Sequence, residues 1–309
     1  MLDFTLLGTA ALVPLPGRAL TAGLLACAGR SILFDCGEGT QTAARAAGVS
    51  LMKTDLIALT HYHGDHIFGL PGLLQTLCSM GRTEPLFLTG PKGLEEALAP
   101  ILKLAGGTGY ELRLLPFPEA GLRLAELAEG WPQGALLTAF RTEHRVSSQG
   151  YCFTLSRAGK FLPRKAAELG IPVKLWSLLQ KGQRVRLGET VILPEQVLGA
   201  PRRGLKLVFS GDTAACEGLL RAAEGADLLI CEGTYGENGQ AELAVEHGHM
   251  NFAQAAEIAA KAGARELWLA HYSQRIEEPE AFRPNAAAIF PNTVCGLDGL
   301  RKTLRFEEE

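Results

Sequence analysis

Apolar and polar positions follow one another along this chain in short runs that predict β-strands, and turn residues separate the runs. In the first 35 residues, proline and glycine divide three such runs, which predicts a meander of short strands. An alanine-rich helix that ends near residue 47 should follow, and strand and helix patterns then alternate. The predicted strands of the first half are residues 2–8, 21–28, 31–35, 55–60, 85–89, 110–116, 122–128, 135–143 and 149–156, and the later predicted helices are residues 67–80 and 93–104.

The second half resumes this alternation with apolar strand patterns at residues 206–212, 227–232 and 266–271, and helical patterns lie between them. In both halves, leading strands are followed by βα units. This organisation predicts an α/β fold with two mixed sheets packed face to face and helices on the outside. With 309 residues and 47% hydrophobic composition, the chain can bury a sizeable core.

Composition narrows the cellular context. The N-terminal residues enter a strand pattern at once, without the basic region, long apolar run or cleavage site of a targeting segment. We therefore expect a soluble, cytoplasmic protein with no membrane segment. The seven cysteines are scattered and never spaced as CxxC, which predicts reduced core residues. A net charge of -3 would argue against a nucleic-acid partner, unless charge of one sign is concentrated locally.

The strongest chemical signal is the run His61-Tyr62-His63-Gly64-Asp65-His66, which directly follows the predicted strand at residues 55–60. Its four imidazole or carboxylate groups, on a turn, can point in several directions and serve two metal ions. That donor set suits zinc, with manganese or iron as rivals. A single HxH often lies in a solvated loop, but HxHxDH between a strand and a helix favours a metal-hydrolase site.

Three further residues complete the candidate ligand set. His144, Asp212 and His271 stand at the C-terminal ends of predicted strands, where side chains from separated segments converge at one edge of a sheet. Each of them alone could simply cap or solvate a strand end. Together with the six-residue motif, they supply donors for two coordination sets.

These residues resemble those of a known family. The HxHxDH run, the distant His144, Ser210-Gly-Asp212-Thr and Ala270-His271 are similar to the metallo-β-lactamase fold, and more narrowly to ribonuclease Z, the tRNA 3′-processing endoribonuclease. The resemblance implies one domain over residues 1–309, built as a four-layer αββα sandwich. The more specific markers are Leu7-Gly-Thr9, Asp35-Cys-Gly-Glu-Gly-Thr-Gln41, Gly69-Leu-Pro-Gly72, and His249 followed by Gln254-Ala-Ala-Glu-Ile-Ala.

The resemblance also implies a mechanism, in which a zinc-dependent enzyme removes the 3′ trailer from precursor tRNA. Two zinc ions would lower the pKa of a shared water and clamp the scissile phosphate. Asp65 would also act as general base, His249 would protonate the departing ribose oxygen, and Glu232 would orient His249. His247 has no matching role and is expected to be solvated. The implied ligands are His61, His63 and His144 for the first ion, Asp65, His66 and His271 for the second, and Asp212 as the bridge between both.

Three other functions stay open at this point. The same ligands would serve a metallo-β-lactamase-fold hydrolase of a small phosphodiester, such as a cyclic nucleotide, or of another ester. A di-iron protein that reduces oxygen or nitric oxide would normally carry Glu in place of His63, together with a flavin domain. A noncatalytic RNA-binding module is disfavoured, because such a module would not need donors at all seven ligand positions, and here every one of these positions is filled.

The chain also departs from the residues that are usual in the family. These departures are Met250-Asn251, Ala214-Ala215 and Arg275-Ile276.

A long basic segment, residues 157–206, interrupts the alternation of strands and helices. It holds eleven Lys or Arg against three Glu, so its net charge is +8 while that of the remainder is -11. Such a concentration of charge predicts a surface that binds the phosphates of a nucleic acid.

Ribonuclease Z enzymes carry in this place an arm that grips tRNA, and the match includes Gly159-Lys-Phe161 and Gly170-Ile-Pro172. However, Val173-Lys-Leu-Trp-Ser177 replaces the usual Gly-Pro-rich tip. The resemblance thus implies precursor tRNA as the partner and a homodimer as the assembly. The substrate-binding residues that we predict are Lys160, Arg164, Lys165, Lys174 and Arg275.

Overall fold

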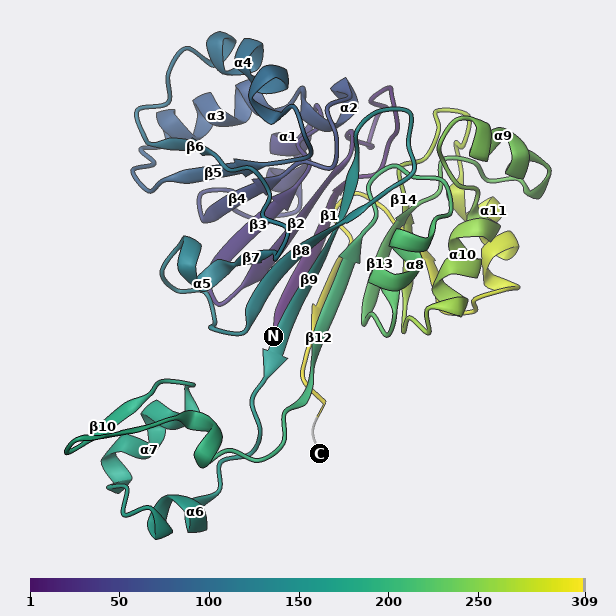
Figure 1. Cartoon of the computed structure of the whole chain (residues 1–309). Helices are drawn as coiled ribbons and strands as arrows, with labels where there is room; N and C mark the ends of the chain where they lie inside the picture. Colours follow the sequence, from purple (N-terminus) through teal and green to yellow (C-terminus); the bar gives the residue numbers. More distant parts are fainter. Residues whose placement is uncertain (308–309) are drawn as a thin grey trace.

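The computed structural model describes residues 1–307 and is drawn in Figure 1. Its body consists of two seven-stranded sheets packed face to face, with helices on both outer faces. A small separate unit projects from one end of this body (Figure 1). The two mixed sheets and their helical layers confirm the predicted αββα sandwich.

The first sheet contains β1 (Leu2–Gly8), β2 (Ala22–Cys27), β3 (Arg30–Phe34), β4 (Thr54–Ala58), β5 (Leu86–Thr89), β6 (Leu112–Leu114) and β16 (Arg301–Leu304). Their order is β16-β1-β2-β3-β4-β5-β6. Strands β1 to β3 form the predicted antiparallel meander, and β3 to β6 run parallel. The outer face of this sheet is covered by α1 (Thr40–Ala46), α2 (Gly64–Ile67), α3 (Leu70–Ser79) and α4 (Leu94–Ala105).

The second sheet contains β7 (Leu122–Arg123), β8 (Ala135–Arg141), β9 (Gln149–Arg157), β12 (Arg202–Phe209), β13 (Leu228–Glu232), β14 (Leu267–Ala270) and β15 (Thr293–Cys295). Their order is β15-β14-β13-β12-β9-β8-β7, antiparallel from β7 to β12 and parallel from β12 to β15. Its outer face is covered by α8 (Glu217–Ala223), α10 (Phe252–Lys261) and α11 (Pro279–Ala287). Between β13 and α10 lie η2 (Asn238–Gln240) and α9 (Ala241–Glu246).

Side chains alternate between the two faces of each strand, and this alternation builds the layers. Leu24 and Leu33 face the helices of the first sheet, whereas their neighbours Leu25 and Ile32 face the second sheet. The core between the sheets is rich in aromatic residues, such as Phe34 and Phe209, whose rings stack at 5.2 Å. All seven cysteines are unpaired and six of them are buried, as predicted.

One predicted strand was wrong over most of its length. Residues 122–128 were expected to form a strand, but β7 has only two residues and α5 (Leu124–Leu127) follows it. The amide of Ala128 donates to Leu124 O at 3.1 Å, which closes a helical turn, and Leu124 is buried between the sheets. A short apolar run fits one helical turn as well as it fits a strand, so the pattern alone could not separate them.

The projecting unit, residues 158–201, is called the arm below. It contains α6 (Pro163–Glu168), α7 (Val173–Gln180), β10 (Val185–Leu187), β11 (Thr190–Ile192) and η1 (Pro194–Gln196). The arm has a hydrophobic core of its own, separate from those of the body. Buried in that core are Ala166, Ile171, Leu179, Val185, Ile192 and Val197.

The first and last few residues of the arm, next to β9 and β12, form a narrow neck (Figure 1). Within the neck, Phe161 bridges Leu198, and the amide of Gly199 donates to Lys160 O at 2.8 Å. The backbones approach so closely that a Cβ atom on Gly159 would lie 2.0 Å from Gly199 O. Glycine is therefore required at position 159.

The arm is shorter than the basic segment that the sequence predicted. Arg157 ends β9, and Arg202, Arg203 and Lys206 belong to β12, so these four cations lie on the body. The arm itself holds seven Lys or Arg and three Glu, a net charge of +4. Among residues 1–307, no helix combines the length and apolar character needed to cross a membrane.

Candidate metal centre

The loops that follow β4, β8, β12 and β14 meet at one edge of the sandwich, where the amide of Gln149 in β9 donates to Thr60 O in the loop after β4 at 2.9 Å. His61 and His63 lie between β4 and α2, and α2 itself carries Asp65 and His66. His144 lies in the loop from β8 to β9, Asp212 three residues beyond β12, and His271 directly after β14. The structure thus brings all seven predicted ligands together.

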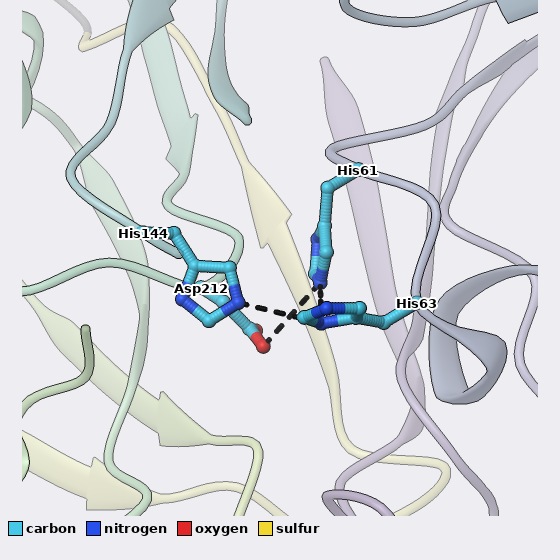
Figure 2. A group of neighbouring side chains, drawn as sticks. All are labelled: His61, His63, His144 and Asp212. Atoms are coloured by element: carbon cyan, nitrogen blue, oxygen red, sulfur yellow. Dashed lines mark hydrogen bonds and ion pairs between the residues drawn. The ribbon is translucent and has the colours of Figure 1, made fainter. Parts of the chain in front are cut away.

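His61, His63, His144 and Asp212 form a first cluster, shown in Figure 2. His63 Nδ1 lies 2.9 Å from His61 Nε2 and 3.4 Å from His144 Nε2, and Asp212 Oδ2 lies 3.7 Å from His61 Nε2. Zinc binds imidazole nitrogen at about 2.0–2.1 Å in tetrahedral sites, which leaves neighbouring ligand atoms roughly 3.3 Å apart. The spacing of these donors therefore fits one tetrahedral metal ion.

Asp65, His66 and His271 form a second cluster. His271 Nε2 lies 3.3 Å from His66 Nε2 and 3.4 Å from Asp65 Oδ2. Asp212 faces this cluster as well, because its Oδ1 lies 3.2 Å from His271 Nε2 and its Oδ2 3.4 Å from His66 Nε2. Asp212 is therefore placed between two donor sets, as a bridging carboxylate would be.

Asp212 is nearly inaccessible to solvent, with 3% of its surface exposed. Within residues 1–307, its Oδ1 is the one buried side-chain oxygen or nitrogen without a hydrogen-bond partner. Burial alone would raise the pKa of Asp212, but the neighbouring His271 and His66 outweigh it and hold that pKa well below its usual range. A cation would compensate this buried carboxylate oxygen, and the donor set around it suits a divalent metal ion.

Hydrogen bonds behind the clusters orient the imidazole rings. The Nδ1–H of His66 donates to Asp35 Oδ2 at 2.9 Å, that of His144 to Gly248 O at 2.9 Å, and that of His271 to Thr234 Oγ1 at 3.0 Å. Each bond holds a proton on Nδ1 and directs Nε2 into its cluster, which is the arrangement typical of metal-binding histidines. Burial also lowers the pKa of His61 well below its usual range, so its imidazole is neutral and able to bind a metal.

Asp35 is a functional residue that the sequence analysis missed. Besides His66, it accepts hydrogen bonds from Thr60 N at 2.7 Å and Thr60 Oγ1 at 2.9 Å, so it supports both the ligand loop and a ligand. The available signal was its position, because Asp35 ends an apolar strand pattern just as Asp212 does. Thr234 was missed too, and no sequence signal marks it.

His249 lies beside the two clusters. Its Nδ1–H donates to Glu232 Oε1 at 2.8 Å, and Thr234 Oγ1 donates to the other Glu232 oxygen at 2.6 Å. Burial disfavours the charged imidazole, but the Glu232 carboxylate outweighs it and raises the pKa of His249 to about 9. His249 therefore carries a proton at neutral pH and can donate it. Asp212, His249 and His271 also lie close enough to form a third set of donors.

His247, which was expected to be solvated, is partly exposed, and its Nδ1 lies 2.6 Å from the hydroxyl of Tyr235. Among the predicted substrate-binding residues, Arg275 is exposed in the loop after β14, at the same edge as the clusters. The other four, Lys160, Arg164, Lys165 and Lys174, belong to the arm.

The arm and the clusters lie at opposite ends of the same strands. His144 precedes β9 and Asp212 follows β12, whereas the arm joins the far ends of these two strands. The eight residues of β12 span about 26 Å at the usual rise of a strand. The structure therefore does not bring the arm residues and the clusters of one chain together.

Two cavities flank the loop that carries His144. One, of about 660 Å³, is lined by Arg145, Cys216 and Gly248, and the other, of about 630 Å³, by Lys92, Phe117 and Phe140. Both are also lined by Arg141, Thr142 and His144. Open space therefore lies on both sides of His144.

Comparison with known proteins identifies the family. The model of the metallo-beta-lactamase superfamily matches residues 17–79, and that of the beta-lactamase superfamily domain matches residues 172–272. Ribonuclease Z of Lachnoclostridium phytofermentans is 41% identical to the chain over an alignment that covers 100% of the chain and 99% of that relative. The chain belongs to the ribonuclease Z family. Ribonuclease Z of Lachnospira eligens is also 41% identical, with 100% of both chains covered.

A crystal structure of the short form of human tRNase Z is similar to the whole chain. Its TM-score is 0.67 at 25% sequence identity, and the match covers 98% of this chain and 100% of the human one. Membership in the ribonuclease Z family confirms the predicted resemblance, and the similar structure agrees with the predicted fold.

One departure from the usual ribonuclease Z residues has a structural explanation. Asn251, one residue of this departure, caps α10, because its side chain accepts from Gln254 N at 2.9 Å while Gln254 accepts from Asn251 N. The amide of the preceding Met250 donates to Glu232 at 3.2 Å. The altered pair thus still fixes the start of α10 next to His249.

Proposed function

We propose that this chain is a metal-dependent endoribonuclease that removes the 3′ trailer from precursor tRNA by hydrolysing one phosphodiester bond. The observation that carries the proposal is the buried Asp212, which faces both donor clusters, in a chain of the ribonuclease Z family. The hydrogen-bonded pair of His249 and Glu232 lies beside these clusters. The proposed cofactor is two zinc ions per chain, with manganese or iron as alternatives. The proposed ligands are His61, His63 and His144 for one ion, Asp65, His66 and His271 for the other, and Asp212 for both.

Two divalent ions held by these residues would supply hydroxide near neutral pH and neutralise charge on the scissile phosphate. Asp65 is oriented by the amide of Leu12, which donates to its Oδ2 at 2.8 Å. An ionised carboxylate only accepts protons, so Asp65 takes the proton of the attacking water as general base. Attack at phosphorus breaks the bond to the ribose 3′ oxygen, and the phosphate stays on the trailer.

His249 protonates the ribose oxygen as it leaves, so that the tRNA product ends in a 3′ hydroxyl. Glu232 keeps the proton on Nδ1 and compensates the charge of the imidazolium, which raises the fraction of His249 ready to donate. A positioned general acid of this kind contributes about 10²–10⁴-fold to a rate.

The two cavities beside His144 support a polymeric substrate over a small ester, because space is available on both sides of this candidate ligand. The positively charged arm supports RNA as that polymer, with Lys160, Arg164, Lys165 and Lys174 as proposed phosphate contacts and Arg275 as a contact near the metal centre. The separation of arm and metal centre within one chain supports a homodimer, in which an RNA held by one arm reaches the partner's metal centre. The proposed location is the cytoplasm.

The proposed function is tested with purified protein of known metal content. An end-labelled precursor tRNA, bis(p-nitrophenyl) phosphate and a cyclic nucleotide are each incubated with it, and the RNA product is sequenced at its 3′ end. We expect one cut that leaves a 3′ hydroxyl on the tRNA. Hydrolysis of the small esters without any cleavage of the RNA would instead favour a small-phosphodiester hydrolase.

Removing the arm should separate binding from catalysis. We expect deletion of residues 161–198 to raise the Michaelis constant for precursor tRNA about ten-fold or more, because the lost cations neutralise phosphates. Hydrolysis of bis(p-nitrophenyl) phosphate should change by less than about two-fold, because such an ester is too small to reach the arm. The junction is favourable because Gly199 N already donates to Lys160 O.

Steady-state kinetics with both substrates measure this effect, and light scattering reports the oligomeric state of each variant. Equal loss on RNA and on the small ester, in a variant whose circular dichroism is unchanged, would mean that the arm supports the metal centre rather than the RNA.

A further inference from the structure

Four arginines gather at the end of the body from which the arm emerges. Arg157 ends β9, Arg203 lies in β12, Arg265 precedes β14, and Arg305 follows β16. Together with Asp227 and Glu307 they line a small depression of about 40 Å³. Outside the arm the chain has a net charge of -7. Four guanidinium groups against two carboxylates therefore form a local positive charge on an otherwise negatively charged body.

The two carboxylates of this depression differ in role. Asp227 is buried, and it accepts from Lys206 N at 2.8 Å and pairs with Arg203 at 2.7 Å, so it is a fixed part of the fold. Glu307 is exposed over 58% of its side chain. Its carboxylate pairs with Arg265 and lies 3.7 Å from Arg203 Nη1.

The backbone next to Glu307 is held by the same depression. The Arg157 guanidinium donates to Glu307 O at 2.7 Å and lies 5.0 Å from the centre of the Phe306 ring. Guanidinium groups match carboxylate and phosphate oxygens with the same planar geometry. An exposed carboxylate within an arginine cluster therefore occupies a site that a phosphate can also occupy.

We infer that the cluster of Arg157, Arg203, Arg265 and Arg305 is a binding surface for the RNA backbone, which the Glu307 carboxylate occupies while RNA is absent. This inference rests on the proposed function. RNA is the partner that fits because the cluster continues the positive charge of the arm: Arg157 and Arg202 are the residues at which the arm joins the body, and Arg202 Nε donates to Ala158 O in the neck at 3.0 Å. These arginines therefore extend the positively charged surface of the arm onto the body.

The first test replaces Glu307 by Gln, which keeps the shape and the backbone contact but removes the charge. Binding of precursor tRNA is measured by fluorescence anisotropy over a range of salt concentrations. We expect E307Q to lower the dissociation constant roughly three-fold at low salt, and we expect this difference to vanish at high salt because exposed charges are screened.

The matched control is Glu257→Gln, which removes one charge from an exposed ion pair with Lys261 on α10, a helix on the outer face of the second sheet. It changes the net charge of the chain by the same amount. An equal effect of E257Q and E307Q, or no effect of E307Q, would overturn the inference.

The second test replaces Arg265 by Gln and uses Arg113→Gln as its control, since Arg113 is an exposed, paired arginine on β6. We expect R265Q to weaken binding and to reduce the slope of log affinity against log salt by about one, whereas R113Q leaves both unchanged. Equal slopes for R265Q and R113Q would overturn the inference. Cleavage of precursor tRNA by the unmodified chain tests the proposed function separately in the same preparation.

Discussion

Replacing Asp212 by Asn is expected to abolish metal-dependent hydrolysis, with a loss of more than about 100-fold, because substitutions of groups that merely support metal ligands already cost 10–100-fold. Asp212 faces both donor sets, so the variant should also bind less metal. Elemental analysis after dialysis measures the metal content, and hydrolysis of bis(p-nitrophenyl) phosphate measures the activity.

Stability gives a readout of Asp212 that does not depend on catalysis. Added metal should raise the melting temperature of the unmodified chain but not that of the variant. Asp298→Asn is the control, since Asp298 is a hydrogen-bonded carboxylate outside the clusters. Full metal content in D212N would contradict the bridging role.

Replacing His249 by Ala is expected to reduce cleavage of precursor tRNA by about 10²–10⁴-fold, because the departing ribose oxygen loses its general acid. The same variant should lose much less activity on bis(p-nitrophenyl) phosphate, because p-nitrophenolate leaves without protonation. Single-turnover kinetics with both substrates measure the difference.

His247→Ala is the matched control for this prediction, since His247 lies two residues away and pairs with Tyr235 instead of Glu232. His249 also belongs to a set of donors with Asp212 and His271, so it could act as a metal ligand instead of a general acid. The metal content of H249A distinguishes these two roles. Unchanged metal in H249A fits a general acid. Lost metal, with equal losses on both substrates, would make His249 a ligand.

The candidate ligands were predictable from the sequence because their types and positions coincide. His61, His63, Asp65 and His66 lie within six residues, and Asp212 and His271 are the last residues of predicted strands. The end of a buried strand is a structural position that hydrophobic periodicity reveals, and the topology of an α/β fold brings such ends together. For these residues, local pattern and tertiary arrangement agree.

The groups behind the ligands were harder to predict, because their role depends on orientation. Thr234 supports His271 only because its hydroxyl proton is directed to Glu232, which leaves its oxygen free to accept.

The strand β16 was not predicted either. It has only four residues, and it pairs with β1 across almost the entire length of the chain, so no local signal marks it.

The limits of the arm could not be read from charge. Arg202, Arg203 and Lys206 are basic, yet they lie in a strand, because long cationic side chains can extend from an exposed strand face into solvent. The helices α6 and α7 are shorter than a helix that is stable alone in water, so the core of the arm decides their formation.

The separate core of the arm has a consequence for the response of the molecule to heat. Six buried side chains form this core, and a unit of that size rarely supplies more than about 3–5 kcal/mol of stability. Through the narrow neck at Gly159 and Gly199, the larger cores of the body cannot support it. Warming would therefore melt the arm while the sandwich and its metal centre persist. At that temperature the chain would still hydrolyse small esters but would no longer hold RNA, so thermal inactivation would begin as a change of substrate range.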